Sequence, residues 1–537
     1  MIFFIQDSLL FVAKALSTPV EQIQFVFCML LCFPLGSVYR TTLHPKRVSA
    51  NTRLAMTILW GLFLGWICLG SEMIILILVC ALCYGFTVSV NPKKVHKVVI
   101  VVSLIWLSVG QIARMILYYG INRFDYSGRL MIMFQKVTYL AFSLHDEFSP
   151  LSQWVETYKR YIMFIKTFDM RCGELESFLT AGLGRRAVEL SKDQKEQRIQ
   201  RIPSLLEYFG YMFHHSTLLA GPVCTFNDFM DFIEGRDIAS ATDQETKKEP
   251  SPTNAVVTKL ASSLLCLVLF CILSKIFPFH LTADSSFIAN SSFLWRMAFA
   301  FLAMFTTRFK YYFAWIIADA VNNACGLGFN GYDPSGRELW NKMTNVYPVD
   351  LEISTNFKDL LNNWNITTNL WLKRIVYQRV SHHRTYFTLA VSAIWHGFYP
   401  GYLLALLVSI LLIVADRKVR HACDDLRGRT SPLINSLLQF LQWMACNPLC
   451  ASYCLAAFVL LRFDLSMNFY RSTYFIGHIL LITTLIICPS GKPRPSHDAR
   501  GANGSVTPSG SFQFELNHKG DSLPSLANNN ALHRKLK

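Results

Sequence analysis

Charged side chains are scarce in this sequence. Asp, Glu, Lys and Arg account for only 16% of its 537 residues, whereas 52% are hydrophobic. Soluble domains carry about 25% charged residues, so the composition argues against a soluble enzyme. Apolar runs long enough to cross or deeply enter a bilayer lie near residues 23–39, 54–70, 73–90, 97–119, 129–144, 204–223, 257–278, 293–323, 385–415, 433–461 and 472–489. The sequence therefore predicts an all-α polytopic membrane protein with about eleven transmembrane helices.

Several motifs that would assign a catalytic class are missing. The chain has no G-x-S-x-G elbow, no H-E-x-x-H zinc motif and no G-x-x-x-x-G-K-[ST] phosphate loop. His280 and Asp284 are one residue too close for the His-Asp pattern of the soluble-faced glycerolipid acyltransferases. No nucleic-acid-binding motif accompanies the net charge of +16, which cytoplasmic loops and anionic lipids explain. Most cysteines, such as Cys80 and Cys83, lie in apolar runs where helix packing is expected, so we predict no metal site.

One buried imidazole stands out. The run from Thr385 to Ala415 holds no formally charged side chain, and its only histidine is His396. Its 31 residues would reach ~46 Å as a single helix, more than the ~30 Å hydrocarbon core. Gly397 and Pro400 follow the histidine closely and predict an interrupted helix that lines protein or a cavity. An ionisable group at membrane depth indicates a functional site.

Two other apolar stretches carry polar side chains. The segment from Phe124 to Phe148 contains Gln135, Lys136, His145 and Asp146. It is either a cavity-lining helix or an interfacial one. Further along, Asp319, Asn322 and Asn323 fall at i, i+3 and i+4, so we expect a polar helical face along a cavity. The sequence GLGFNG that follows is expected to end this helix.

A basic segment precedes the His396 run. It contains Lys358, Lys373, Arg374, Arg379 and Arg384. Such a concentration of charge can attract an anionic cosubstrate, or it can be a cytosolic loop that follows the positive-inside rule. Both interpretations stay open at this point.

The domain organisation follows from the apolar runs. Residues 1–488 are predicted to form a single multi-pass membrane domain, and residues 489–537 a disordered cytosolic tail. The last five residues, HRKLK, resemble a dilysine-type retrieval signal of endoplasmic reticulum membrane proteins. With a cytosolic tail, the His396 run should begin and end near the same face, as a partly penetrating pair of short helices.

The strongest signal is a pair of motifs. WNITTNLWLKRIVYQRV followed by AIWHGFYPGY resembles the signature of the membrane-bound O-acyltransferase (MBOAT) family. LLAGPVCTFNDFMDFIEG and RFKYYFAWIIADAVNNACGLGFNGYD are similar to its lysophospholipid acyltransferase branch, and DYSGRLMIMFQKVTYLAFSLHDEF to members that use lysophosphatidylethanolamine, lysophosphatidylserine or lysophosphatidylcholine. The resemblance extends from about Asp125 to the last apolar run. It implies broken or re-entrant helices around a buried catalytic channel.

The resemblance also implies roles for single residues. His396 would be the catalytic base, with Asn365 as its partner. Residues that match the acyl-CoA and catalytic channel are Trp364, Tyr377 and Ser392, and the basic residues expected to hold coenzyme A are Lys373, Arg374 and Arg379. The implied reaction reacylates a lysoglycerophospholipid with acyl-CoA as cosubstrate, in phospholipid remodelling at the endoplasmic reticulum membrane, with no bound cofactor.

Three alternatives remain at this stage. A related acyltransferase with a protein or sterol acceptor would share the motifs, and a membrane transporter would also use broken helices with buried polar groups. Asn365 begins an N-x-T glycosylation sequon, although its basic surroundings indicate the cytosolic side. Asn290, in N-S-S between two apolar runs, is the better candidate for a luminal sequon.

Overall fold

The computed structural model describes residues 2–121, 125–148, 190–241, 249–427 and 430–488. Within these ranges the chain is helical and contains no strand, only isolated β-bridges that join Tyr332 to Glu338 and Val346 to Trp364. The all-α prediction is confirmed. The predicted tail from residue 489 onward lies outside the described residues.

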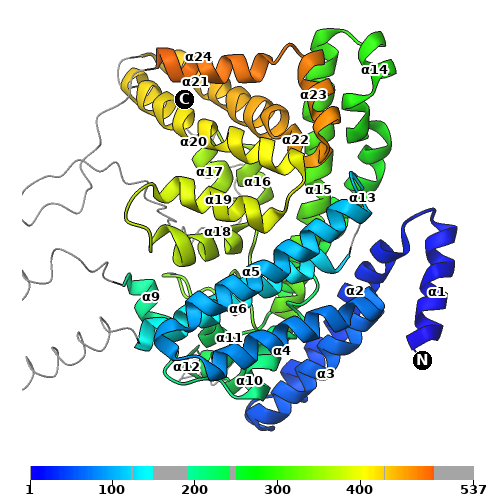
Figure 1. The fold of residues 1–537 in the computed structure, drawn as a ribbon, viewed down its shortest axis with the longest axis vertical. Coiled ribbons are helices and arrows are strands. Elements are labelled where there is room, and N and C mark those ends of the chain that lie inside the picture. The colour runs from blue at the N-terminus through cyan, green and yellow to red at the C-terminus, as the bar shows by residue number, and fades with distance from the viewer. Residues whose placement is uncertain (1, 122–124, 149–189, 242–248, 428–429, 489–537) are drawn as a thin grey trace, which may run out of the picture.

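The first half of the chain forms a bundle around one buried helix, α6. Its elements are α1 (Ile2–Ala15), α2 (Val20–Thr41), α3 (Ala50–Leu69), η1 (Gly70–Glu72), α4 (Met73–Ser89), α5 (Pro92–Leu117), α6 (Tyr126–Phe148), α9 (Lys192–Glu196), α10 (Leu205–Met212), α11 (Phe226–Glu234) and α12 (Arg236–Ala241). In Figure 1, α5 crosses the middle of the molecule, and α4 and α6 pack against it. Of the 23 residues of α6, 16 are buried, which favours the cavity-lining alternative over the interfacial one.

Short polar residues mark where these apolar helices begin. The Ser49 hydroxyl accepts a hydrogen bond from the backbone N–H of Thr52 at the start of α3. Before α5, the Asn91 side chain accepts from the N–H of Lys93, and Pro92 occupies the first helical position. Side-chain caps of this kind satisfy backbone donors that have no partner within the helix. The loops between the apolar runs therefore define where each helix starts.

The second half is built on a long helical hairpin and the segments that follow it. Its elements are α13 (Thr253–Ile276), η2 (Phe279–Ala283), α14 (Ser285–Asn290), α15 (Phe293–Cys325), α16 (Pro348–Glu352), α17 (Phe357–Asn362), α18 (Ile366–Leu372), η3 (Lys373–Tyr377), α19 (Arg384–His396), α20 (Pro400–Arg427), α21 (Pro432–Met444), η4 (Ala445–Cys454), α22 (Ala456–Leu460), α23 (Phe463–Ser472) and α24 (Ile476–Ile487). The segments η3 and η4 are π-helical. α15 ends at Gly326, which adopts a left-handed conformation with φ 103°, so the predicted helix end is confirmed.

Several helices are long and apolar enough to cross a membrane. Among the described residues there are five such stretches, Val20–Thr41, Ala50–Ser89, Pro92–Leu117, Thr253–Ala283 and Pro432–Leu460. A sixth is obtained if α23 and α24, bent by 76°, are counted as one span. These stretches agree with a polytopic membrane protein. The predicted number of about eleven crossings stays a prediction.

The run that contains His396 is interrupted as predicted. α19 ends at His396, and α20 begins at Pro400. α19 has 13 residues, too few for a full crossing, but α20 has 28 and would extend over ~42 Å. The prediction of two short helices is therefore wrong for α20. Its helix continues beyond Ala415 into polar turns, where Lys418 Nζ donates to the carbonyl oxygens of Leu485 (2.7 Å) and Cys488 (2.9 Å).

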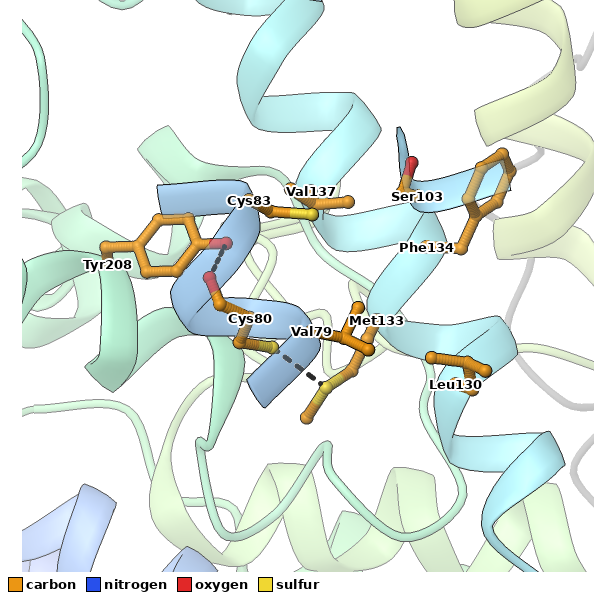
Figure 2. Close-up of a pocket in the computed structure, with 9 residues that line it drawn as sticks. All are labelled: Val79, Cys80, Cys83, Ser103, Leu130, Met133, Phe134, Val137 and Tyr208. Carbon is orange, nitrogen blue, oxygen red and sulfur yellow. Dashed lines mark hydrogen bonds between the residues drawn. The ribbon is translucent and has the colours of Figure 1, made fainter. Parts of the chain in front are cut away.

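The Cys80 and Cys83 pair serves helix packing, as predicted. Figure 2 shows both side chains on α4, facing α6 across a cavity of only about 10 Å³. The Tyr208 hydroxyl donates to the carbonyl oxygen of Cys80 at 3.0 Å, and the Cys80 sulfur lies 3.1 Å from that of Met133. A cavity of this size holds at most one water molecule, so it is a packing defect rather than a ligand site.

Candidate active site

A large cavity lies between the two halves of the chain. Its volume is about 540 Å³, within the range of sites for small molecules. Side chains from α5, α6, α15 and the segment from α16 to α22 line it. Both residues of the predicted catalytic pair, His396 and Asn365, are in its wall, and so are Trp364, Tyr377, Ser392 and Lys373. The structure therefore brings together six of the eight predicted site residues.

His396 is the last residue of α19, and its ring is surrounded by aromatic side chains. The ring centroids of Trp395, Phe458 and Tyr402 lie 4.7, 5.0 and 6.0 Å from that of the imidazole. No described residue forms a hydrogen bond with the imidazole. Both ring nitrogens are thus left for molecules that enter the cavity.

The backbone on either side of His396 is held by α5 and α6. Trp395 donates from Nε1 to the carbonyl oxygen of Met131 (3.1 Å) and accepts from Gln111 Nε2 through its own carbonyl (3.4 Å). Gly397 has φ 113°, and a Cβ there would lie 2.7 Å from Gln111 Oε1. A side chain at position 397 would therefore strain the backbone and displace Gln111. Glycine lets the chain turn directly after the histidine.

The start of α20 is fixed in a similar way. The Tyr399 hydroxyl donates to the carbonyl oxygen of Tyr118 at 3.0 Å, and the Gly401 N–H donates to that of Leu461 at 2.7 Å. A Cβ at Gly401 would lie 2.1 Å from the backbone oxygen of Ala457. Only glycine permits this close approach of two backbones. The interruption predicted from Gly397 and Pro400 is thus a rigid feature.

Asn365 precedes α18 in a left-handed conformation with φ 49° and ψ 50°. Asn345 determines which end of its amide faces the cavity. Asn345 Oδ1 accepts hydrogen bonds from Thr367 N (2.9 Å) and Oγ1 (2.8 Å). A backbone N–H can only donate, so the other end of the Asn345 amide is its NH₂ group, which donates to Asn365 Oδ1 at 3.1 Å. The remaining group of Asn365, its NH₂, is a hydrogen-bond donor without an acceptor among the described residues.

The other predicted channel residues have distinct surroundings. The Trp364 ring packs edge-on against Trp315 and Tyr311 of α15, with centroids 4.8 and 5.6 Å apart. Ser392 lies one helical turn before His396 on α19 and is buried. Tyr377 is buried at the end of η3, with the Arg384 guanidinium 5.9 Å from its ring centroid. All three contribute to the wall of the cavity.

The predicted basic residues separate into two groups. Lys373 lines the cavity. Arg374 does not, because its Nε donates to Asp193 at 2.9 Å in a two-pronged ion pair. Arg379 is also outside the cavity wall and donates from both terminal nitrogens to Asp146, at 2.7 Å each. Each of these two arginines therefore forms an ion pair with a carboxylate of the protein outside the cavity wall.

Among the polar residues predicted to face a cavity, Gln135 of α6 does so, but those of α15 do not. Gln135 of α6 lines the cavity and donates to Thr368 Oγ1 at 2.9 Å. The expected polar face of α15 does not line it. Asp319 instead pairs with Lys259 at 2.7 Å, and Asn322 accepts from the Ser216 hydroxyl at 2.7 Å. Asn323 bonds to the backbone of Trp340 (3.2 Å), so this face serves packing between segments.

Four charged residues in the cavity wall were not predicted as site residues. They are Arg114, Asp125, Arg129 and Arg308. Arg308 pairs with Glu352 at 2.7 Å, and the Tyr312 hydroxyl donates to the same carboxylate at 2.6 Å. The feature of the sequence that could have identified them is charge within or beside apolar runs, because such residues usually face the interior of a membrane protein. The sequence could not show which cavity they share.

The arrangement can transfer an acyl group without a covalent intermediate. An imidazole can accept a proton, and the outward NH₂ of Asn365 can donate to a developing oxyanion. Within the part of the chain that the structure describes, the Ser392 hydroxyl forms no hydrogen bond with His396 and so is not activated as a nucleophile. No group of three or more His, Cys, Asp or Glu side chains among the same residues could hold a metal ion.

The sequence comparisons agree with this geometry. Residues 26–455 match the membrane-bound O-acyltransferase family, a region that begins well before the first quoted motif. Membrane-bound glycerophospholipid O-acyltransferase 1 of Mus musculus is 33% identical over 500 residues, which cover 91% of this chain and 94% of that protein. For membrane-bound glycerophospholipid O-acyltransferase 2 of Rattus norvegicus the identity is 34% over 526 residues, 96% of this chain and 94% of the relative.

A third relative comes from an insect. Lysophospholipid acyltransferase 6 of Drosophila melanogaster is 33% identical over 512 residues, which cover 93% of this chain and 66% of that protein. The family match extends over most of the chain, and it contains both motifs that carry His396 and Asn365. The chain is therefore a multi-pass membrane acyltransferase that belongs to the membrane-bound O-acyltransferase family.

Proposed function

We propose that this protein transfers an acyl group from acyl-CoA to the free glycerol hydroxyl of a lysophospholipid. The acceptor would be lysophosphatidylethanolamine, lysophosphatidylserine or lysophosphatidylcholine. The observation that carries the proposal is the cavity of about 540 Å³ with an unpartnered imidazole and an outward amide NH₂ in its wall. The names of the relatives, which are glycerophospholipid and lysophospholipid acyltransferases, support this choice of acceptor.

In the proposed reaction His396 is the general base. It accepts the proton of the glycerol hydroxyl while that oxygen attacks the thioester carbonyl. The C–S bond then breaks, and the imidazolium returns the proton to the coenzyme A sulfur. The products are a diacyl phospholipid and free coenzyme A, so no other reactant is needed.

Asn365 would stabilise the charge that forms on the carbonyl oxygen. Its NH₂ group is held in place by Asn345, so a donor is already oriented before the substrates bind. Lys373, which lines the cavity and belongs to the basic segment, would contact the phosphates of coenzyme A. Coenzyme A would enter and leave on the cytosolic side, and the protein would reside in the endoplasmic reticulum membrane.

Acyl transfer in microsomes tests the proposal directly. Membranes from cells that express the protein are given labelled acyl-CoA with each lysophospholipid, and His396→Ala serves as the inactive variant. We expect the wild type to form diacyl product and the variant to lose at least ~100-fold in turnover at equal protein abundance. Asn365→Ala should be severely impaired as well.

The same assay separates the alternatives. A protein or sterol acceptor would leave lysophospholipids unacylated while another acceptor is labelled. A transporter would show no acyl transfer with any acceptor. Near-normal turnover by His396→Ala would contradict the assignment of the base even if the acceptor is correct.

A further inference from the structure

One end of the cavity carries two buried guanidiniums and a carboxylate. Arg114, Asp125 and Arg129 all line the cavity and are 9%, 5% and 2% exposed. Arg114 Nε lies 3.1 Å from Asp125 Oδ2, and Arg129 Nη1 donates to the backbone oxygen of Asp125 at 2.9 Å. Glu72 is half-buried, does not line the cavity and accepts from the Tyr126 N–H. The surface that faces the cavity therefore has more positive than negative charge.

The carboxylate is also well satisfied by neutral donors. Asp125 Oδ1 accepts from the N–H of Ser127 at 2.9 Å and from its hydroxyl at 2.5 Å. These bonds fix Asp125 as the first cap of α6, whose N-terminus points at the same end of the cavity. The N-terminus of a helix of this length attracts anions. Two arginines and a helix terminus thus converge on one place.

Space for a ligand exists beside these charges. Gly128, next to Arg129 in the first turn of α6, lines the cavity, and a Cβ built there would meet no atom within 4 Å. A glycine within a helix costs stability relative to alanine. Here the absence of a side chain leaves space in the cavity next to Arg129.

Arg114 lies about one turn of α5 from a residue that contacts the backbone at His396. Gln111 of α5 contacts the backbone on both sides of His396, through the carbonyl of Trp395 and through Gly397. Arg114 follows Gln111 by three residues on the same helix, a rise of ~4.5 Å. In a lysoglycerophospholipid the free hydroxyl and the phosphate are separated by glycerol carbons and one ester oxygen, which span a similar length.

We propose that Arg114, Arg129 and the N-terminus of α6 bind the phosphodiester of the lysophospholipid acceptor, with Gly128 leaving room for it. The inference rests on the proposed function, since it identifies what part of the acceptor lies next to the reacting hydroxyl. Charge-assisted bonds from arginine are strong and directional, so the phosphate would hold the hydroxyl at His396. The protein would then discriminate against uncharged glycerol lipids.

A competition experiment with the wild-type protein tests recognition of the phosphate. A monoacylglycerol has the acyl chain and glycerol hydroxyls of a lysophospholipid but lacks its phosphate. At equal mole fraction in detergent micelles we expect it to inhibit lysophospholipid acylation at least ~10-fold less well than a second lysophospholipid does. Equal inhibition by the two lipids would overturn the inference.

Gly128→Leu tests the position of the site. The added side chain meets no protein atom at its Cβ, and leucine favours the helix, so the protein should remain folded. We expect the KM for lysophospholipid to rise at least ~10-fold while the KM for acyl-CoA changes little. Gly85→Leu is the matched control, because Gly85 on α4 also has no atom within 4 Å of its Cβ position and does not line the cavity. Equal effects of the two variants would contradict the placement.

Removing a positive charge shows whether the arginines bind the phosphate of the lysophospholipid or those of coenzyme A. Arg129→Gln should raise the KM for lysophospholipid, and Arg129→Lys, which keeps the charge, should restore part of the affinity. Arg462→Gln, near Tyr119 at the same end of the molecule but outside the cavity wall, is the control. If Arg129→Gln raises the KM for acyl-CoA instead, the arginines bind coenzyme A and the inference fails. The proposed function itself fails only if the wild type does not acylate lysophospholipids.

Discussion

Asn345→Asp should reverse the amide of Asn365 without removing it. One oxygen of the introduced carboxylate would still accept from Thr367, as Asn345 Oδ1 does now at 2.9 Å. The other oxygen would replace the NH₂ group that donates to Asn365 Oδ1 at 3.1 Å. Two acceptors at this distance repel each other, so the Asn365 amide should rotate by half a turn and donate to the new carboxylate. Its carbonyl oxygen would then face the cavity in place of its NH₂ group.

The size of the effect follows from the strength of the bond that drives the rotation. A hydrogen bond to a charged group contributes ~1.5–3 kcal/mol, so the rotated form should exceed the original one by ~10- to 100-fold. Molecules in the rotated form lose a donor to the oxyanion, which by itself costs ~100- to 1,000-fold in turnover. The minority that keeps the original orientation therefore determines the remaining rate. We expect kcat to fall ~10- to 100-fold.

The measurement is the kcat and KM of acyl transfer in microsomes, normalised to protein abundance. Because Asn345 does not act on the ground-state substrates in this scheme, the KM for lysophospholipid should change much less than kcat. Asn330→Asp is the matched control: Asn330 Nδ2 donates to Asn341 Oδ1 at 2.8 Å in a second asparagine pair, exposed and outside the cavity. A kcat for Asn345→Asp within a factor of about two of wild type would refute the orientation assigned to Asn365.

Three further predictions concern the basic residues, the helix break and the topology. Lys373→Gln should raise the KM for acyl-CoA ~10-fold. Arg379→Gln should lower the amount of folded protein, since it takes the guanidinium away from a buried carboxylate, at a cost of ~3–5 kcal/mol. Kinetics of the first variant and size-exclusion profiles of the second check this, and an unchanged KM or an unchanged amount of folded protein would contradict the respective role. Gly401→Ala should destabilise the protein by ~1–3 kcal/mol, because its Cβ would overlap the backbone oxygen of Ala457 at 2.1 Å, and a melting temperature equal to that of wild type would show that the two backbones can separate. An epitope placed after residue 489 should be accessible to antibody in sealed microsomes without detergent, and protection of the epitope would place the tail in the lumen and remove the basis for a retrieval signal.

Local signals in the sequence were sufficient for the all-α class and for the break after His396. Gly397 disfavours a continuous helix through its conformational freedom, and Pro400 does so because it lacks a backbone N–H, so the interruption could be predicted without knowledge of any neighbour. The length of α20 could not. Its polar C-terminal turns pack against the last apolar run, where Lys418 bonds to backbone oxygens 67 and 70 residues away, and no local pattern shows that contact.

Partners that lie far apart in the sequence explain the remaining differences. Arg374 and Arg379 look alike beside Lys373 in the sequence, yet their carboxylates come from 181 and 233 residues away. The polar face of α15 likewise follows helical spacing, but spacing shows only that its residues share a side. Which side faces the cavity depends on the packing of α13 and of the loop with Ser216. No pattern in the sequence pointed to Asn345, because its role depends on its contacts with Asn365 and Thr367 in the folded protein.

The left-handed backbone of Asn365 makes an unusual experimental tool available. A side chain at φ 49° strains the backbone, and glycine relieves that strain. Replacing Asn365 by glycine would thus remove the whole amide from the cavity while the peptide settles more easily into its native conformation. The relief of strain would offset part of the hydrogen bond lost from Asn345, so a folded but inactive protein could hold acyl-CoA and its acceptor side by side long enough for both to be observed.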